Sequence, residues 1–309
     1  MKLTKKELAN KVTEVTVVVP PSDLKKEYEH ALSHFKNEVE VKGFRKGQAP
    51  LDLVKKHVDT KKLQNEVINH IYPKAVNKAI KDYKIVPVMQ PKIKINKISD
   101  VDFEAVLIFI GRPDVKLADY KKVAKVATTK VEKESKTPKI ETAKNMAEAK
   151  EKAKTENSAK DLKNEPSKEQ RVLNQTYEDL IDQSKIDLPD LMVAEEQNRL
   201  LTGFINYLAK LKVNFDDYLK SQKITLQKVQ NDYKKQATRN LKLEFILSEI
   251  AKKEKLTVDE KEVKEVIDNT PDENYKKYLS QPSQKYYIES QLLKNKVANK
   301  LVEFSEVKK

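Results

Sequence analysis

The chain has 309 residues, of which 38% are hydrophobic and 36% are charged, and its formal net charge is +14. It contains no cysteine and no tryptophan, which excludes disulfides, thiol nucleophiles, iron–sulfur clusters and thiolate zinc sites. Its length suits two domains and a linker. The longest apolar run, Ala105–Ile110, is far too short to span a bilayer, and the basic start leads into a strand-like segment rather than a signal-peptide core. We therefore expect a cytoplasmic protein that does not insert into a membrane.

Positive charge is concentrated in the first part of the sequence. Residues 1–126 carry a net charge of +10, whereas residues 127–170 and 171–309 carry +2 each. A basic domain indicates a polyanionic partner, most often a nucleic acid. A generally lysine-rich composition explains the same excess, and charge alone does not separate the two interpretations.

The first elements predict a strand followed by helices. Val12–Val19 alternates like a strand and ends at Pro20-Pro21. Ser22 is then a candidate N-cap for a helix whose apolar residues, from Leu24 to Val39, recur every three or four positions. After a loop at 43–50, the sequence predicts a short helix from Pro50 through His57. A longer helix follows over Thr60–Tyr83, with a kink at Pro73.

Strand-like segments follow the long helix, at Ile85–Met89, Lys92–Ile98 and Asp102–Ile110, and Gly111-Arg112-Pro113 predicts a turn. The order of strand, helices and strands predicts an α+β domain over residues 1–126.

Residues 127–170 differ in composition from the rest of the chain. No aromatic residue occurs between Lys121 and Thr176, so this stretch buries too little apolar surface to form a domain. We predict a low-complexity linker, within which Lys139–Lys154 suits a solvated helix.

Residues 171–309 show almost purely helical patterns and predict an elongated all-α domain. Helices are expected after Pro189, after the candidate caps Asn214 and Thr225, after a capping box at Thr257–Glu260, and over Gln284–Phe304.

Catalytic and metal-binding motifs are not evident. The sequence has no G-x-x-x-x-G-K-[ST] and no G-x-G-x-x-G. His30 and His34 are four residues apart, as two metal ligands on a helix would be, but no third ligand is evident in the sequence. We expect them to have a surface or packing role, and we expect no catalytic residue, no metal and no cofactor.

One loop combines an apolar ring with two cations. Gly43 and Gly47, two of only four glycines in the chain, bracket Phe44-Arg45-Lys46. Glycines permit a tight exposed turn, a ring at its tip favours contact with a partner, and arginine and lysine bind anions. Taken alone, the pattern also suits a loop that only connects two helices.

The segment Gly43-Phe44-Arg45-Lys46-Gly47-Gln48-Ala49-Pro50 resembles the ribosome-docking signature of the trigger factor family of bacterial nascent-chain chaperones. Val15–Pro20 and Pro113–Leu117 are similar to the borders of that family's ribosome-binding domain. Arg239–Leu247, Glu249–Glu254 and Lys296–Val307 are similar to its C-terminal domain. The resemblance covers roughly residues 1–123 and 171–309.

The linker is where the chain departs from that family. Trigger factors usually carry an FKBP-like prolyl isomerase domain at this place, and its pocket is lined by aromatic residues. The aromatic-free stretch cannot supply such a pocket. The resemblance thus implies a chaperone without the isomerase domain.

The resemblance implies an ATP-independent, ribosome-associated chaperone that holds nascent or unfolded polypeptides. Its partners would be a ribosomal protein at the tunnel exit, ribosomal RNA and unfolded chains, and a weak homodimer is left open. The ribosome-binding residues would be Gly43, Phe44, Arg45, Lys46 and Gly47. Candidate client-binding residues, each of which also suits a core position, are Leu201, Phe204, Tyr207, Phe215, Tyr286 and Tyr287.

Three other hypotheses remain open at this point: a basic RNA-binding module without a chaperone role, a prolyl isomerase with an unrecognised site, and a periplasmic chaperone. The start of the sequence argues against the last of these, because it does not resemble a signal peptide.

Overall fold

The computed structural model describes residues 1–134 and 166–306. These residues form two compact units, which are described separately. The first comprises Met1–Pro113 with Leu188–Met192, and the second comprises the remainder from Asp114 onward. The helix predicted at Lys139–Lys154 lies outside the described residues.

The first unit is built on a four-stranded antiparallel sheet with the strand order β1-β2-β4-β3. Its strands are β1 (Lys2–Glu7), β2 (Val12–Val19), β3 (Lys92–Ile98) and β4 (Phe103–Ile110). Alternate residues of β2 and β4 are buried, among them Val15, Val17 and Leu107. Because side chains alternate between the faces of a sheet, this pattern means that one face is covered.

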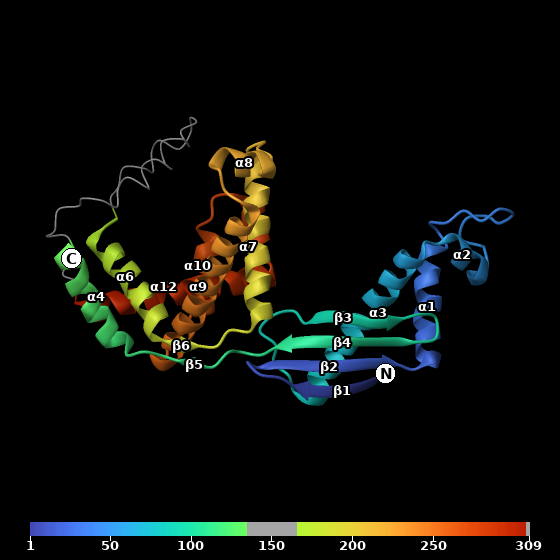
Figure 1. Ribbon diagram of the computed structural model, residues 1–309, viewed down its shortest axis with the longest axis horizontal. Helices are drawn as coiled ribbons and strands as arrows, with labels where there is room; N and C mark the ends of the chain where they lie inside the picture. Colours follow the sequence, from blue (N-terminus) through green and yellow to red (C-terminus); the bar gives the residue numbers. More distant parts are fainter. Residues whose placement is uncertain (135–165, 307–309) are drawn as a thin grey trace. The chain divides into compact units, whose positions relative to one another are not determined.

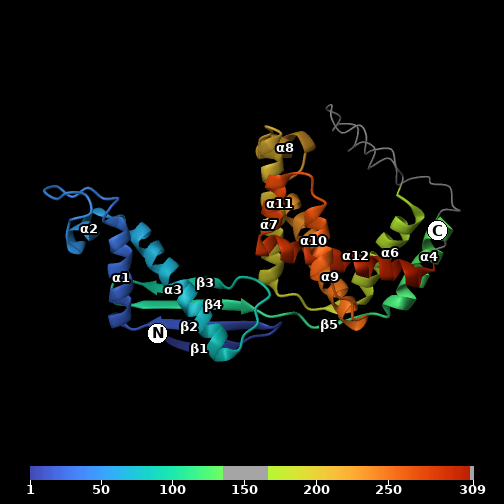
Figure 2. The same cartoon turned by 180° about the vertical axis from the view of Figure 1, so that it is seen from behind.

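The first unit also contains three helices, which are α1 (Pro21–Phe35), α2 (Leu51–His57) and α3 (Thr60–Tyr83) (Figures 1 and 2). The core joins the buried face of the sheet to α1 and α3, through residues such as Leu24 and Ile71. Helix α1 begins at Pro21, with Pro20 and not Ser22 at the N-cap position. Helix α3 runs as one helix across Pro73.

Two sequence predictions for this unit differ from the structure. β1 was not predicted, because its lysines hide the alternation, yet it pairs with β2 along its whole length. Ile85–Met89 was predicted as a strand but is irregular and makes a single strand-like hydrogen bond, from Val88 N–H to Ile110 C=O at 2.9 Å. Pro87 within this segment has no N–H to donate, so a regular ladder cannot form there.

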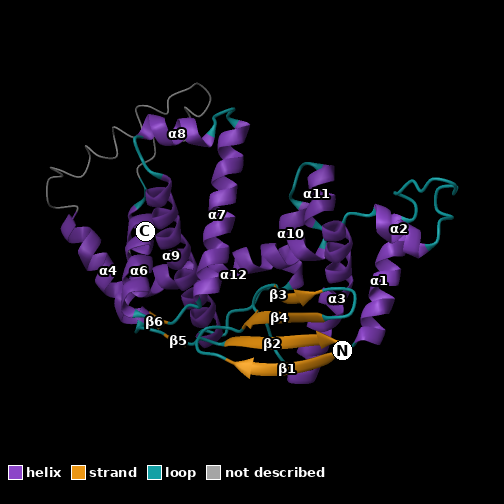
Figure 3. Ribbon diagram, turned by 45° about the vertical axis from the view of Figure 1, so that its right-hand side comes forward, coloured by secondary structure: helices purple, strands orange, loops and turns teal. Residues whose placement is uncertain are grey.

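The second unit is mostly helical (Figure 3). Its elements are β5 (Val115–Lys116), α4 (Tyr120–Glu134), α6 (Lys168–Gln183), β6 (Lys185–Ile186), α7 (Asp190–Lys210, from Val193 onward in this unit), α8 (Phe215–Gln222), α9 (Leu226–Lys253), α10 (Glu260–Asp268), α11 (Glu273–Leu279) and α12 (Pro282–Ser305). The predicted combination of an α+β region with a mostly helical region is confirmed. The two-residue pairing of β5 with β6 is an addition to it.

The main core of the second unit joins α4, α6, α9 and α12. Leu180, Ile246, Ile250, Val297 and Leu301 are almost fully buried in it. A smaller cluster of Ile267, Leu279 and Ile288 joins α10, α11 and α12. Within residues 1–134 and 166–306, no helix combines the length and apolar character needed to cross a bilayer.

Part of the predicted linker is helical in the structure. α4 continues to Glu134, and Val131 packs with Ala127 and with Val172 of α6. Lys130 on the same helix makes an ion pair with Asp179, with 2.7 Å between Nζ and Oδ1. The composition of this stretch did not reveal that it packs, because its few apolar residues form a core cluster only together with Val172 of α6. Residues 127–134 therefore belong to α4, and residues 168–170 belong to α6.

Helix caps were predicted with mixed success. Asn214 accepts a hydrogen bond from Asp216 N–H, and Thr225 accepts one from Lys228 N–H, as predicted. The capping box at α10 lies two residues later than predicted. Asp259 occupies the N-cap position, and its N–H donates to Glu262 at 2.9 Å.

Candidate functional site

The glycine-bracketed loop connects α1 to α2 in the first unit (Figure 1). Its ends are fixed by the buried side chains of Val41 and Ala49. Gly47 N–H donates to Lys36 C=O at 3.0 Å, and Phe44 N–H donates to Val41 C=O at 3.1 Å. The loop therefore has a defined base, with its tip at residues 42–46.

Both glycines have left-handed backbone conformations, with φ of 85° at Gly43 and 82° at Gly47. Side chains rarely adopt these angles, so the turn geometry itself calls for glycine. At Gly47 a Cβ would also lie 2.5 Å from Asn37 Oδ1, whereas nothing lies within 4 Å at Gly43.

The tip presents a ring and two cations to solvent. The Phe44 side chain is 44% exposed, and Arg45 and Lys46 are exposed as well. Neither the Arg45 nor the Lys46 side chain has a hydrogen-bond or ion-pair partner among the residues that the structure describes. An exposed ring beside free cations can bind a surface that is apolar in one place and anionic next to it.

Most of the lysines near the loop in sequence are also available to a partner. Lys55 is an exception, because it pairs with Asp100. The others are exposed and make no ion pair within the described part of the chain: Lys42, Lys56, Lys61 and Lys62. The basic character predicted for this region therefore persists after folding.

The candidate client-binding residues divide into two groups. Leu201, Phe204 and Phe215 are half-buried. Phe204 on α7 lies 6.3 Å from Phe215 and 5.2 Å from Tyr218, both on α8, and 5.6 Å from Tyr233 on α9, between ring centroids. Burial raises the pKa of Tyr233. This aromatic cluster joins three helices and leaves only part of each ring accessible.

Tyr207, Tyr286 and Tyr287 are exposed, at 59%, 75% and 59%. Sequence reasoning missed further exposed apolar side chains in the same unit, which are Val126, Ile205, Leu211, Val213, Leu226, Val266, Tyr275 and Tyr278. The rings of Tyr275 and Tyr278 stack with their centroids 5.9 Å apart. The sequence did contain a signal for this pair, because residues three apart on a helix are neighbours on its surface.

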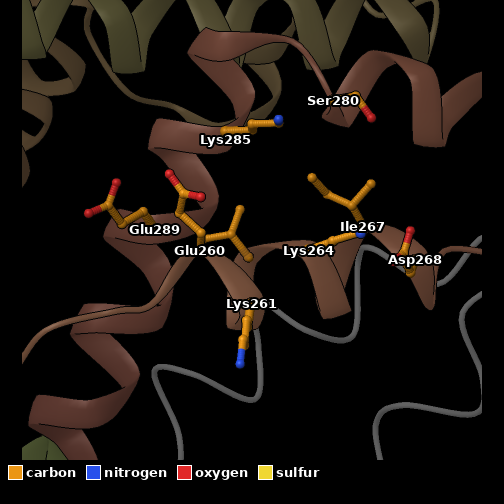
Figure 4. A pocket seen from close by; sticks show the side chains of 9 residues that line it. Glu260, Lys261, Lys264, Ile267, Asp268, Ser280, Lys285 and Glu289 are labelled. Carbon is orange, nitrogen blue, oxygen red and sulfur yellow. The ribbon is translucent and has the colours of Figure 1, made fainter.

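A pocket of about 520 Å³ lies among α10, α11 and α12 (Figure 4). Val263 and Ile267 form its apolar part, and charged side chains surround them. The charged lining residues are Glu260, Lys261, Lys264, Asp268, Lys285 and Glu289. The lining of this pocket therefore combines charges of both signs with a small apolar patch.

The first unit exposes an aromatic ring and two unpaired cationic side chains on one loop, and the helical unit exposes several aromatic side chains. Such exposed apolar and charged groups are typical of proteins that bind other macromolecules. Comparison with known families makes the assignment specific. The sequence model described as "Bacterial trigger factor protein (TF)" matches residues 1–144, and that of the "Bacterial trigger factor protein (TF) C-terminus" matches residues 141–303. The chain belongs to the trigger factor family.

Individual relatives agree with this assignment. Trigger factor from Dehalococcoides mccartyi is 32% identical over 123 residues, which are 40% of this chain and 27% of the relative. Trigger factor from Staphylococcus aureus is 33% identical over 110 residues, which are 35% of this chain and 25% of the relative. The matched part thus spans about a quarter of the curated relatives' length.

The fold is also similar to a solved structure. The chain superposes on one from a study of promiscuous substrate recognition by the trigger factor chaperone, with a TM-score of 0.61, 16% identity and coverage of 99% of this chain and 100% of the other. At this level of sequence identity, the similarity shows a shared fold.

Proposed function

We propose that this protein is a ribosome-associated, ATP-independent chaperone that docks through residues 43–47 and holds nascent or unfolded polypeptides. The observation that carries the proposal is the exposed Phe44 ring beside the unpaired Arg45 and Lys46, on a turn that both glycines shape. Membership of the trigger factor family supports the same assignment.

Docking divides into two physical contributions. Phe44 buries apolar surface against a ribosomal protein, worth about 25 cal/mol per Å2 of area removed from water. Arg45 and Lys46 contact carboxylates or ribosomal RNA phosphates, and Lys42, Lys56, Lys61 and Lys62 add longer-range attraction. Because phosphate contacts release counterions, affinity falls with increasing salt.

Client holding is assigned to the helical unit. Its exposed apolar side chains, Tyr207, Tyr286 and Tyr287 among them, offer contacts to any unfolded segment. Burial of a few hundred Å2 of client yields several kcal/mol before entropy losses. Weak contacts of this kind permit holding and release without a nucleotide.

We assign no prolyl isomerase activity to this chain. The composition of residues 127–170 supports this, because it lacks the aromatic residues that line an isomerase pocket of the family's usual type. A proline-peptide isomerisation assay should give the uncatalysed rate. A clearly faster rate would contradict the assignment and favour an isomerase with an unrecognised site.

Ribosome co-sedimentation tests the docking proposal. The wild type should pellet with ribosomes at about 100 mM salt, where exposed charges are screened beyond about 10 Å. The triple variant Phe44→Ala/Arg45→Ala/Lys46→Ala should remain in solution. Equal pelleting of the two proteins would refute docking through this loop.

A matched control removes the same charge and one exposed apolar side chain elsewhere in the first unit. Val86, Lys6 and Lys94 are exposed and lie away from the loop in sequence, and Val86→Ala/Lys6→Ala/Lys94→Ala should still pellet. If the control variant lost binding to the same extent, net charge and not the loop would explain the attachment. That result would favour a basic RNA-binding module, as would full competition by RNA alone together with normal binding of Phe44→Ala.

A further inference from the structure

Three of the four histidines in the chain lie together in the first unit. His30 and His34 are four residues apart on α1, and His70 lies on α3. Their ring centroids are 4.5 Å apart for His30 and His70, 4.9 Å for His30 and His34, and 5.1 Å for His34 and His70. The sequence offered no third partner for the first two, because His70 lies on a different helix, beyond the loop and α2.

The spacing of their nitrogen atoms suits one metal ion. All three imidazoles present a ligand atom within 4.8 Å of the others, and the Nδ1 atoms of His30 and His70 are 3.2 Å apart. Tetrahedral Zn²⁺ with Zn–N bonds of about 2.0–2.1 Å places its ligand nitrogens about 3.4 Å from each other. One pair already has that spacing. The third ligand atom, from His34, lies within 4.8 Å of the other two, and the His34 side chain is 49% exposed, so solvent and not packed protein borders it.

The surroundings favour a cation. Glu66, one turn before His70 on α3, accepts a hydrogen bond from His34 Nδ1 at 2.9 Å and lies 3.4 Å from His70 Nε2. A carboxylate hydrogen-bonded to an imidazole is the usual support of a metal-ligating histidine, because it fixes the ring orientation. The nearby Lys74 is neutralised by Glu27, with 2.6 Å between Nζ and Oε1.

We propose that His30, His34 and His70 form a binding site for a divalent metal ion of the zinc type, which links α1 to α3. Three neutral imidazoles suit Zn²⁺, Ni²⁺ and Cu²⁺ far better than Mg²⁺ or Ca²⁺. Glu66 is a positioning residue, and water occupies the remaining coordination position at the surface. Because α1 leads directly into the loop at 36–50, the bound ion steadies the helix from which that loop emerges. The proposal does not depend on ribosome docking.

Zinc titration of the full-length protein against a chromogenic chelator tests the site. The wild type should bind one equivalent of Zn²⁺, and binding to the folded state should raise its thermal midpoint. His30→Ala and His34→Ala, both at exposed positions, should each weaken binding at least tenfold. Glu66→Gln, which removes a supporting carboxylate and not a ligand, should weaken it less than either histidine substitution does.

His57 provides the matched control, because it is the fourth histidine and lies on α2, where its Nδ1 contacts the Leu53 carbonyl at 2.9 Å. His57→Gln should bind zinc like the wild type. Co²⁺ in place of Zn²⁺ should give the visible absorption of a nitrogen-coordinated ion, lost in His34→Ala. Absence of one-equivalent binding, or equal weakening in His57→Gln and His34→Ala, would overturn the proposal.

Discussion

Val131 tests whether the end of α4 is a packed part of the helical unit. The sequence predicts a solvated linker from residue 127 onward, whereas the structure buries Val131 to 5% exposure against Ala127 and Val172. Val131→Ala removes two carbon atoms from this contact. At about 0.8 kcal/mol for each buried carbon, with a further cost for the cavity, the change should destabilise the docking of α4 by about 2 kcal/mol.

Amide hydrogen exchange measures this locally, which matters because a protein of two units does not have a single unfolding free energy. A loss of about 2 kcal/mol corresponds to roughly 30-fold faster exchange through openings that expose α4. Val126 is the matched control, since it lies on the same helix and is 42% exposed. Val126→Ala should leave exchange nearly unchanged. Equal effects of the two substitutions would mean that α4 is solvated, and the packing described for it would be wrong.

Three further predictions concern glycine, pH and the aromatic cluster. A Cβ added at Gly203, inside α7, would meet no atom within 4 Å, so Gly203→Ala should stabilise the helical unit against urea by up to about 1 kcal/mol. Gly47 has a φ of 82°, so Gly47→Ala should destabilise the first unit against urea by about 1–2 kcal/mol. Stabilisation of the first unit by Gly47→Ala would refute the assigned loop geometry. The hydrogen bond from Tyr120 and then the contacts of Lys121 lower the pKa of Glu254 below its usual value. This carboxylate therefore stabilises the fold at neutral pH, and its contribution is lost as pH falls through the lowered pKa. Urea midpoints of the wild type and Glu254→Gln should consequently differ at neutral pH and converge in acid, and a constant difference would contradict the assignment. Phe204→Ala should destabilise the α7–α8 junction by about 3 kcal/mol or less, because the ring is only half-buried; an unchanged exchange rate in α8 would show that the ring cluster does not hold it.

Local patterns predicted most of the helices, because amphipathic periodicity and caps depend on neighbouring residues. The helix over Thr60–Tyr83 and the caps at Asn214 and Thr225 agree with the structure for this reason. β1 was missed because its charged residues suit an exposed edge strand and carry little apolar signal.

Features that depend on distant partners could not be predicted. Val131 is buried only because α6 supplies Val172. His70 joins His30 and His34 only because α3 packs on α1. The exposure of Phe44 follows from a loop whose base is fixed by Val41 and Ala49, and the sequence suggested the exposed tip but not these anchors.

Photo-crosslinking from position 44 tests the central proposal most directly. A photoreactive phenylalanine analogue in place of Phe44 keeps the ring and reports what lies against it. With translating ribosomes at physiological salt, the account predicts a covalent adduct with a protein of the large ribosomal subunit, absent when Arg45 and Lys46 are replaced by alanine. Adducts confined to the protein's own chain, or no adduct with ribosomes, would contradict docking through this loop.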